Sequence, residues 1–114
     1  MSERNDLLLL EDILEAITDI ENFTSGFSYE DFAGDKKTFN AVIRSFSIIG
    51  EAANKLSAET TVKYNEIEWY KVISFRNRLI HEYFGVDYEM VWEVIKNYLS
   101  ILKKYVERII REKE

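Results

Sequence analysis

The chain has 114 residues and a mass of 13.5 kDa, which is the usual size of one domain, and 46% of its residues are hydrophobic. That composition excludes a globally disordered protein. The chain has no cysteine and one histidine, so disulfides and thiolate metal sites are excluded, and we expect neither a metal ion nor a cofactor.

The formal net charge of −6 is unevenly distributed along the chain. Residues 1–35 hold ten acids and one base, whereas residues 36–114 hold eleven acids and fourteen bases. An acidic protein is a poor match for a long non-specific nucleic-acid tract. The mildly basic second part is still compatible with a focused phosphate site.

The first apolar run contains acidic residues, and no run reaches the roughly 18 apolar residues that a membrane span requires. We therefore expect a soluble, cytoplasmic protein that does not contact a membrane.

Hydrophobic residues recur every three or four positions over most of the chain, and proline is absent. This periodicity predicts an all-α fold, an antiparallel four-helix bundle with one extra short helix, as a single domain over residues 1–114. The expected elements are a helix over 5–22, a connection over 24–34 with a short turn at 29–32, a helix over 36–56 capped by Asp35, a short helix over 57–64, a turn at 65–68, a helix over 69–82 and a last helix over 87–111, capped by Asp87.

The last predicted helix is apolar on two sides, so it needs two packing partners. One partner is the rest of the bundle, and the other is either a second copy of the chain or the connection over 24–34. The main seam comprises Val91, Ile95, Tyr98, Leu102, Tyr105 and Ile109, and the second comprises Trp92, Leu99 and Val106.

The helix over 69–82 carries an arginine among its apolar positions. On a helical wheel Arg76 falls within the predicted buried face, and His81 falls on a separate polar strip with Asn77. A buried unpaired charge is costly, so Arg76 must reach an anion. Either Arg76 pairs with a carboxylate such as Glu51 while His81 is structural, or both serve a functional site. The predicted buried face is Trp69, Val72, Ile73, Leu79 and Ile80, and the polar strip is Tyr70, Ser74, Asn77 and His81.

In the preceding long helix, Gly50 and its small neighbours should allow a second helix to approach closely.

Arg76, His81 and Tyr83 form the pattern Arg-x4-His-x-Tyr. In this pattern the chain resembles the HEPN-domain ribonucleases, and specifically the HepT toxin family. The similarity continues over nearly the whole chain, in residues 48–53, Ile67-x-Trp69, and 83–87 followed by Val91-Trp92. At Glu68 relatives often have a proline, and this departure affects only a turn outside the motif.

The resemblance implies a metal-independent endoribonuclease toxin of a type VII-like toxin–antitoxin system. It further implies a homodimer whose active site lies in the cleft between two chains. The helix geometry is compatible with this, because Arg76 and His81 lie about 140° apart around one helix. Two such helices meeting across a two-fold axis would bring one chain's arginine towards the other chain's histidine.

In such a site His81 would act as general base or acid while a ribose 2′-hydroxyl attacks the adjacent phosphate of the RNA. Arg76 would bind that phosphate and stabilise the charge of the transition state. Asn77 would orient His81 or contact the phosphate. The expected product ends in a 2′,3′-cyclic phosphate.

The resemblance also implies a role for Tyr83, because the motif tyrosine of the family is modified with AMP by a cognate minimal nucleotidyltransferase (MNT) antitoxin. An adenylyl group on Tyr83 would add bulk and negative charge two residues from His81. An unmodified Tyr83 can also simply cover the helix end beside Phe84.

Other basic side chains are interpreted as solvated. Arg78 points away from His81 and is interpreted as a solvated charge. Contact with the backbone of the substrate is the lesser alternative. The basic outer face of the last helix is interpreted by default as solvated. Contact with RNA or with the antitoxin is the second interpretation. Its residues are Lys96, Lys103, Lys104, Arg108 and Arg111.

Two other functions remain open from the residues alone. One is a non-catalytic helical subunit that binds a nucleotide or partners a minimal nucleotidyltransferase, with Arg76 as its phosphate contact. The other is a purely structural dimer, which gives Arg76 no functional reason for its position.

Overall fold

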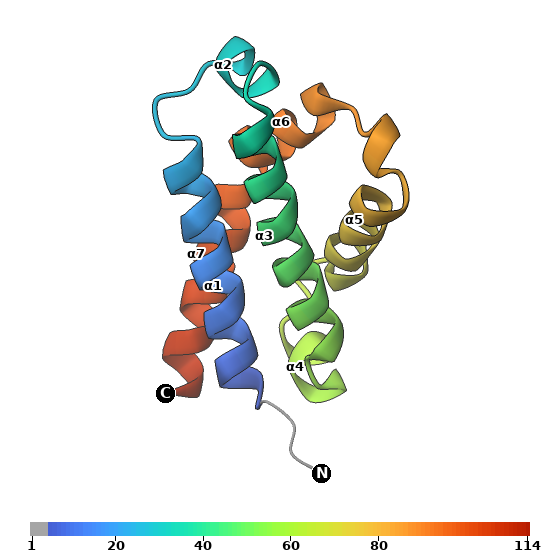
Figure 1. The fold of residues 1–114 in the computed structure, drawn as a ribbon. Helices are drawn as coiled ribbons and strands as arrows, with labels where there is room; N and C mark the ends of the chain where they lie inside the picture. The colour runs from blue at the N-terminus through green and yellow to red at the C-terminus, as the bar shows by residue number, and fades with distance from the viewer. Residues whose placement is uncertain (1–4) are drawn as a thin grey trace.

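The computed structural model describes residues 5–114, and this part of the chain is helical without a strand (Figure 1). The predicted fold class is therefore confirmed. The elements are α1 (Asp6–Phe23), α2 (Tyr29–Ala33), α3 (Lys36–Lys55), α4 (Ala58–Lys63), α5 (Trp69–His81), the 3-10 turn η1 (Tyr83–Gly85), α6 (Tyr88–Asn97) and α7 (Leu99–Lys113).

The long helices alternate in direction, and they differ in how many neighbours they have. Helix α1 lies against both α3 and α7, whereas α5 has its main packing against α3 (Figure 1). The short α2 covers the end of the bundle by contacting α3 and α6. Helix α5 is thus mounted on one side of a core that the other long helices form.

The core contains most of the apolar residues that the sequence pattern identifies, although Tyr98 of the predicted main seam is 63% exposed. Because helical stability in proteins comes mainly from burying an apolar face, the buried residues explain why the helices form. The largest fully buried side chains include Leu10, Ile13, Ile17 and Ile20 of α1, Phe32 of α2, Val42 and Ile49 of α3, Leu79 of α5, Val91 of α6, and Val106 and Ile109 of α7.

The helix starts follow local capping chemistry. Asp35 accepts from the Thr38 amide at 3.0 Å, and Asp87 accepts from the Glu89 amide at 2.9 Å, so both predicted caps are confirmed. A short turn was predicted at 29–32, and the structure has the helix α2 there. A reciprocal capping box between Ser28 and Asp31 stabilises its start.

Asp6, in the first turn of α1, connects this helix to α4. Its carboxylate accepts from the Ser57 amide at 3.1 Å and from the hydroxyls of Ser57 and Thr60. Burial alone would raise the pKa of the Asp6 carboxyl, but the hydrogen bonds from Ser57 and Thr60 outweigh it, and the pKa lies below its ordinary value of 3.8. The contact joins segments about fifty positions apart and fixes the start of α4 against α1.

The last predicted helix is wrong in one respect, because the chain breaks it into α6 and α7 at Tyr98. No glycine or proline marks the break; Tyr98 has φ −119° and ψ −27°, and its amide still donates to Val94. The break allows α6 to cross the end of the bundle towards α2 while α7 runs along α1 (Figure 1). Packing on two differently oriented neighbours therefore overrides the continuous helical pattern.

The second seam of that helix is covered within the chain. Leu99 and Val106 are buried, and the ring of Trp92 lies 5.2 Å from the ring of Phe32 in α2. Of the two partners considered for this seam, the 24–34 connection is therefore the one that covers Trp92. This seam does not require a second copy of the chain.

No helix in the described part is long and apolar enough to span a membrane.

Candidate active site

Helix α5, which carries the motif, is held by its first turn and by a few buried side chains. The indole Nε1 of Trp69 donates to the carbonyl oxygen of Tyr64 at 3.2 Å, and Leu79 is 1% exposed. Val72 and Ile73 are half-buried, but Ile80 is 46% exposed, so its predicted burial is wrong. The reason is that α5 packs mainly on one neighbour, which covers only part of the apolar stripe.

Arg76 lies where α3 and α5 approach most closely. A Cβ atom built on Gly50 would lie 2.2 Å from Cβ and 2.5 Å from Cγ of Arg76, which is far inside van der Waals contact. Only glycine fits opposite Arg76 without a shift of one helix. The expectation of close helix approach at Gly50 is confirmed, and the facing residue is the motif arginine itself.

The guanidinium of Arg76 has no anionic partner within the described chain. Its Nε is buried without a hydrogen bond, and the side chain as a whole is half-buried. The suggested pairing with Glu51 is wrong, because Glu51 instead pairs with Lys55 at 3.3 Å. A buried donor without a partner costs free energy. The unpaired Nε of Arg76 is therefore what we expect of a side chain that binds an anion from outside the chain.

His81 and Asn77 are both exposed, at the end of α5 and one turn before it. They share one face of the helix, as the predicted polar strip requires. The half-buried Arg76 faces α3 while His81 is open to solvent, so a single chain presents them in different directions.

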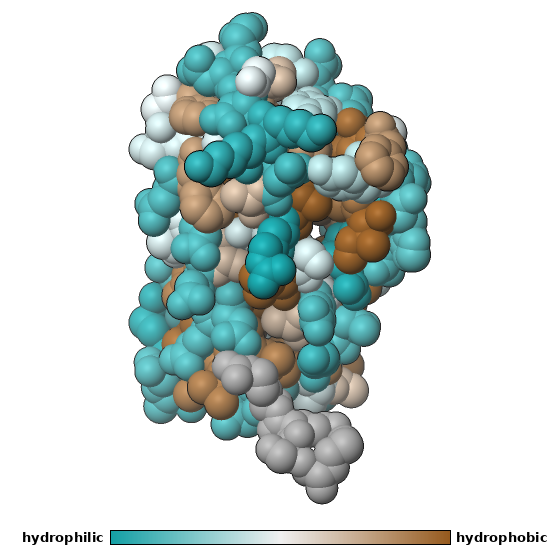
Figure 2. All heavy atoms as spheres, viewed as in Figure 1, coloured by the Kyte–Doolittle hydropathy of each residue, from teal (hydrophilic) through white to brown (hydrophobic). Residues whose placement is uncertain are grey.

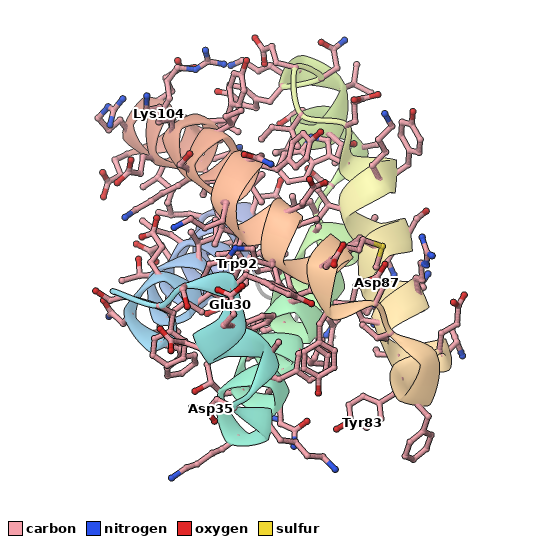
Figure 3. The ribbon with its side chains drawn as sticks, turned by 90° about the horizontal axis from the view of Figure 1, so that it is seen from above. Glu30, Asp35, Tyr83, Asp87, Trp92 and Lys104 are labelled. Carbon is pink, nitrogen blue, oxygen red and sulfur yellow. The ribbon has the colours of Figure 1, made fainter. Side chains whose placement is uncertain are left out.

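Tyr83 follows in η1, and its hydroxyl donates a hydrogen bond to Oδ1 of Asn40 in α3. Figure 3 shows the Tyr83 side chain extending from this turn towards the start of α3. The neighbouring Phe84 is 100% exposed, with its ring edge-on to Tyr83 at 5.2 Å. Asn40 could not be predicted as the partner of Tyr83, because no sequence spacing links residues 43 positions apart.

The cations around the motif differ in whether they have partners. Arg78 is exposed and lies 3.7 Å from Glu82, which agrees with its interpretation as a solvated charge. Arg44 and Arg76 form no ion pair with any described residue. Arg44 is exposed in α3, in the sequence between Asn40 and Gly50, which contact Tyr83 and Arg76 respectively.

The main groove of the structure does not include the motif residues. A groove of about 470 Å³ opens between α3, α5 and the α6–α7 break, and it is mostly apolar, with lining that includes Phe46, Val72, Phe75, Tyr98 and Leu102 but neither Arg76 nor His81. Residues 5–114 also contain no group of three or more side chains suited to hold a metal ion.

Comparison with known proteins fits this arrangement. Residues 13–109 match the family described as "Ribonuclease HepT-like". The chain belongs to the HepT-like ribonuclease family. A relative in Methanocaldococcus jannaschii, "Putative RNase MJ0127", is 39% identical over 114 residues, which cover all of this chain and 94% of the relative. "Probable ribonuclease HepT" of Thermococcus cleftensis is 44% identical over 100 residues, 88% of this chain and 91% of the relative.

No solved structure matches the HepT-like chain. The family prediction made from the Arg-x4-His-x-Tyr pattern is confirmed, since both the family match and the relatives cover the motif region. Membership in a ribonuclease family makes RNA the substrate class to consider for the site around Arg76 and His81.

Proposed function

We propose that this HepT-like chain is a metal-independent endoribonuclease whose active site is completed by a second copy of the chain. The observation that carries the proposal is the state of Arg76, a half-buried guanidinium with an unpartnered Nε, on the same helix as the exposed His81. A phosphodiester would supply the missing anion. The family match supports RNA as its source.

In the proposed reaction His81 removes the proton from a ribose 2′-hydroxyl, which attacks the adjacent phosphorus. The bond from phosphorus to the 5′-oxygen breaks, a 2′,3′-cyclic phosphate remains, and a protonated histidine returns a proton to the leaving oxygen. Arg76 stabilises the extra negative charge on the phosphate oxygens during this step. Asn77, on the same face as His81, orients the imidazole or contacts the phosphate.

The proposal of a homodimer rests on exposed apolar side chains at the end of the motif helix α5. Large apolar side chains flank the motif without cover from their own chain, namely Ile80 at 46% and Phe84 at 100% exposure. Figure 2 shows hydrophobic side chains gathered at the upper right, over α5 and the turn after it. Such a patch is typical of an interface. Two motif helices meeting there would bring Arg76 of one chain towards His81 of the other.

The regulatory part of the proposal concerns Tyr83. We infer that the chain is the toxin of an HepT/MNT toxin–antitoxin pair, in which the minimal nucleotidyltransferase transfers AMP to Tyr83. Tyr83 lies two residues beyond His81, and its hydroxyl is hydrogen-bonded to the exposed Asn40 of α3. A bulky anion attached there would repel and obstruct the phosphate of an incoming RNA.

The nuclease is tested by incubating RNA with the wild-type protein and with His81→Ala, both in EDTA. Wild-type cleavage should produce 2′,3′-cyclic phosphate ends, and loss of a general acid–base should slow it by about 100-fold or more. Lys71→Ala is the matched control, since Lys71 lies exposed on the same helix and pairs only with Glu68 at the surface. Equal cleavage by His81→Ala would contradict the assignment. No cleavage by the wild type would favour the non-catalytic partner-binding subunit.

A further inference from the structure

We propose that Asn40 and Arg44 of α3 form a binding site for the phosphodiester anion carried by Tyr83 when the tyrosine is modified. The inference rests on the proposed modification of Tyr83. The new element is the assignment of the side chains that bind the adenylyl group once it is attached to Tyr83. These two residues would clamp the adenylyl phosphate against α3.

The placement of the Tyr83 hydroxyl is the first observation. Its oxygen donates a hydrogen bond to Oδ1 of Asn40, so any group bonded to that oxygen begins its path at the surface of α3. Figure 3 shows the tyrosine reaching from η1 towards this helix. The phosphorus of an adenylyl group is one bond beyond the hydroxyl oxygen. It therefore lies next to the Asn40 side chain.

The chemistry of the Asn40 amide suits both states of the tyrosine. The free hydroxyl has a proton to donate, and the amide oxygen accepts it. After modification that proton is gone and the neighbouring phosphate oxygens are acceptors. A half-turn of the amide then presents its NH₂ group as donor in place of its oxygen. Aspartate would accept from the hydroxyl equally well but could not donate to the phosphate.

Arg44 supplies the counter-charge. It lies one helical turn after Asn40, so their Cβ atoms are about 5–6 Å apart. Side chains on a helix lean towards its N-terminus, which directs Arg44 back towards Asn40. Arg44 is exposed and forms no ion pair with any residue from 5 to 114. A guanidinium with free donors is the side chain best suited to hold a phosphodiester.

Modification of Tyr83 is a nucleotidyl transfer, because an AMP group moves from the nucleoside triphosphate to the tyrosine oxygen. The Tyr83 oxygen attacks the α-phosphorus of a nucleoside triphosphate held by the transferase, the bond from that phosphorus to the bridging oxygen breaks, and pyrophosphate leaves. The hydroxyl proton passes to a base of the transferase or to solvent. The amide of Asn40 is too weak a base to retain it. The clamp acts on the product, by holding the adenylyl group in place beside His81.

The experiment compares thermal unfolding of modified and unmodified protein for wild type and variants, after treatment with the nucleotidyltransferase and ATP. Intact mass confirms the adenylyl group on each sample. In the wild type, modification should raise Tm by about 4 °C, because charged hydrogen bonds replace a neutral one. In Asn40→Asp it should lower Tm, since the carboxylate repels the phosphate. In Arg44→Ala the increase should disappear.

Lys55→Ala is the matched control, because Lys55 is exposed on the same helix about 22 Å from Asn40 and should retain the wild-type increase. Modified wild-type and variant proteins with equal Tm shifts would overturn the clamp while leaving the modification intact. A wild type that gains no adenylyl group would overturn the modification and the clamp together. RNA cleavage by the unmodified proteins is assayed in parallel, so that loss of the nuclease is recognised separately.

Discussion

The core helices and the motif helix of this HepT-like chain differ in what holds them. Helix α1 is enclosed by α3 and α7, and its Leu10, Ile13, Ile17 and Ile20 are 0% exposed. Helix α5 leans on α3, and only Trp69 and Leu79 of its thirteen residues are buried. The stability of the fold therefore resides in the core. The motif lies at its margin, where side chains such as His81 and Asn77 remain exposed.

Because the two regions are held differently, we expect stability and activity to respond to different substitutions. Removing a buried side chain leaves a cavity that the neighbours fill only in part, which costs several kcal/mol. Changing an exposed side chain at the margin costs little stability. Four variants test this division, and they are given from the largest expected effect to the smallest.

Ile17→Ala should cause the largest loss of stability, about 3 kcal/mol, because Ile17 is 0% exposed between core helices. Ile80→Ala is its matched control on α5, where the same truncation at a 46% exposed position should cost no more than about 1 kcal/mol. Urea denaturation followed by circular dichroism gives both values. Equal losses would show that α5 is as firmly integrated as α1.

Gly50→Ala should affect both regions, because the added methyl group would lie 2.2 Å from Cβ of Arg76 and must push α5 away from α3. We expect a loss of about 1–3 kcal/mol. RNA cleavage should decrease more than this destabilisation explains, since the guanidinium is displaced. The neighbouring Glu51→Ala changes an exposed side chain and should leave both properties near wild type. Wild-type cleavage by the folded Gly50→Ala variant would contradict the positional role of this contact.

Asp6→Asn tests the connection between α1 and α4 and should cost about 1–2 kcal/mol at neutral pH. The folded-state pKa of Asp6 lies below 3.8, so its contribution is present above the unfolded-state value and is lost as pH falls through the folded value. The wild-type advantage over Asp6→Asn should therefore shrink below about pH 4. Denaturation curves at several pH values measure it, and an advantage independent of pH would contradict the role of the charge.

The smallest effect on the free energy of unfolding of a single chain should come from the double substitution Ile80→Ser and Phe84→Ser. Both side chains are exposed within the chain, so the monomer should change by less than about 1 kcal/mol. If they form the interface, self-association should weaken strongly, as sedimentation equilibrium would show. The matched control is Val62→Ser, which alters a 70% exposed side chain on α4. Unchanged association in the double variant would place the interface elsewhere.

Most of the fold could be predicted from periodicity and capping residues. The spacing of buried residues in α1 and α3 and the caps at Asp35 and Asp87 are local signals, so the sequence displays them directly. The break at Tyr98 could not be predicted, because it carries no local signal. It arises from the different directions in which α6 and α7 find their neighbours.

The residues of the candidate site were proposed from the sequence, whereas their surroundings could not be predicted from it. Arg76, His81 and Tyr83 follow from the motif, and the unusual position of the arginine follows from the helical wheel. A helical wheel treats the whole apolar stripe as buried, so it predicts burial of Ile80, whereas α5 packs mainly on one neighbour. Pairing of Arg76 with Glu51 was expected because a lone arginine often pairs with a carboxylate, but Glu51 pairs with Lys55. The contacts with Gly50 and Asn40 depend on how α3 and α5 dock, and docking geometry is a property of two distant segments.

The contact of Arg76 with Gly50 has a consequence for how sequences of this kind can diverge. The distance between the axes of α3 and α5 determines the position of Arg76, because Gly50 has no side chain and leaves room for the arginine. No side chain on α3 therefore has to be complementary to Arg76. Neighbouring surface residues can therefore drift without moving the guanidinium. An insertion, a shift of register or a change in the tilt of α3 would be transmitted to it directly. Such a design tolerates substitution well and backbone remodelling poorly.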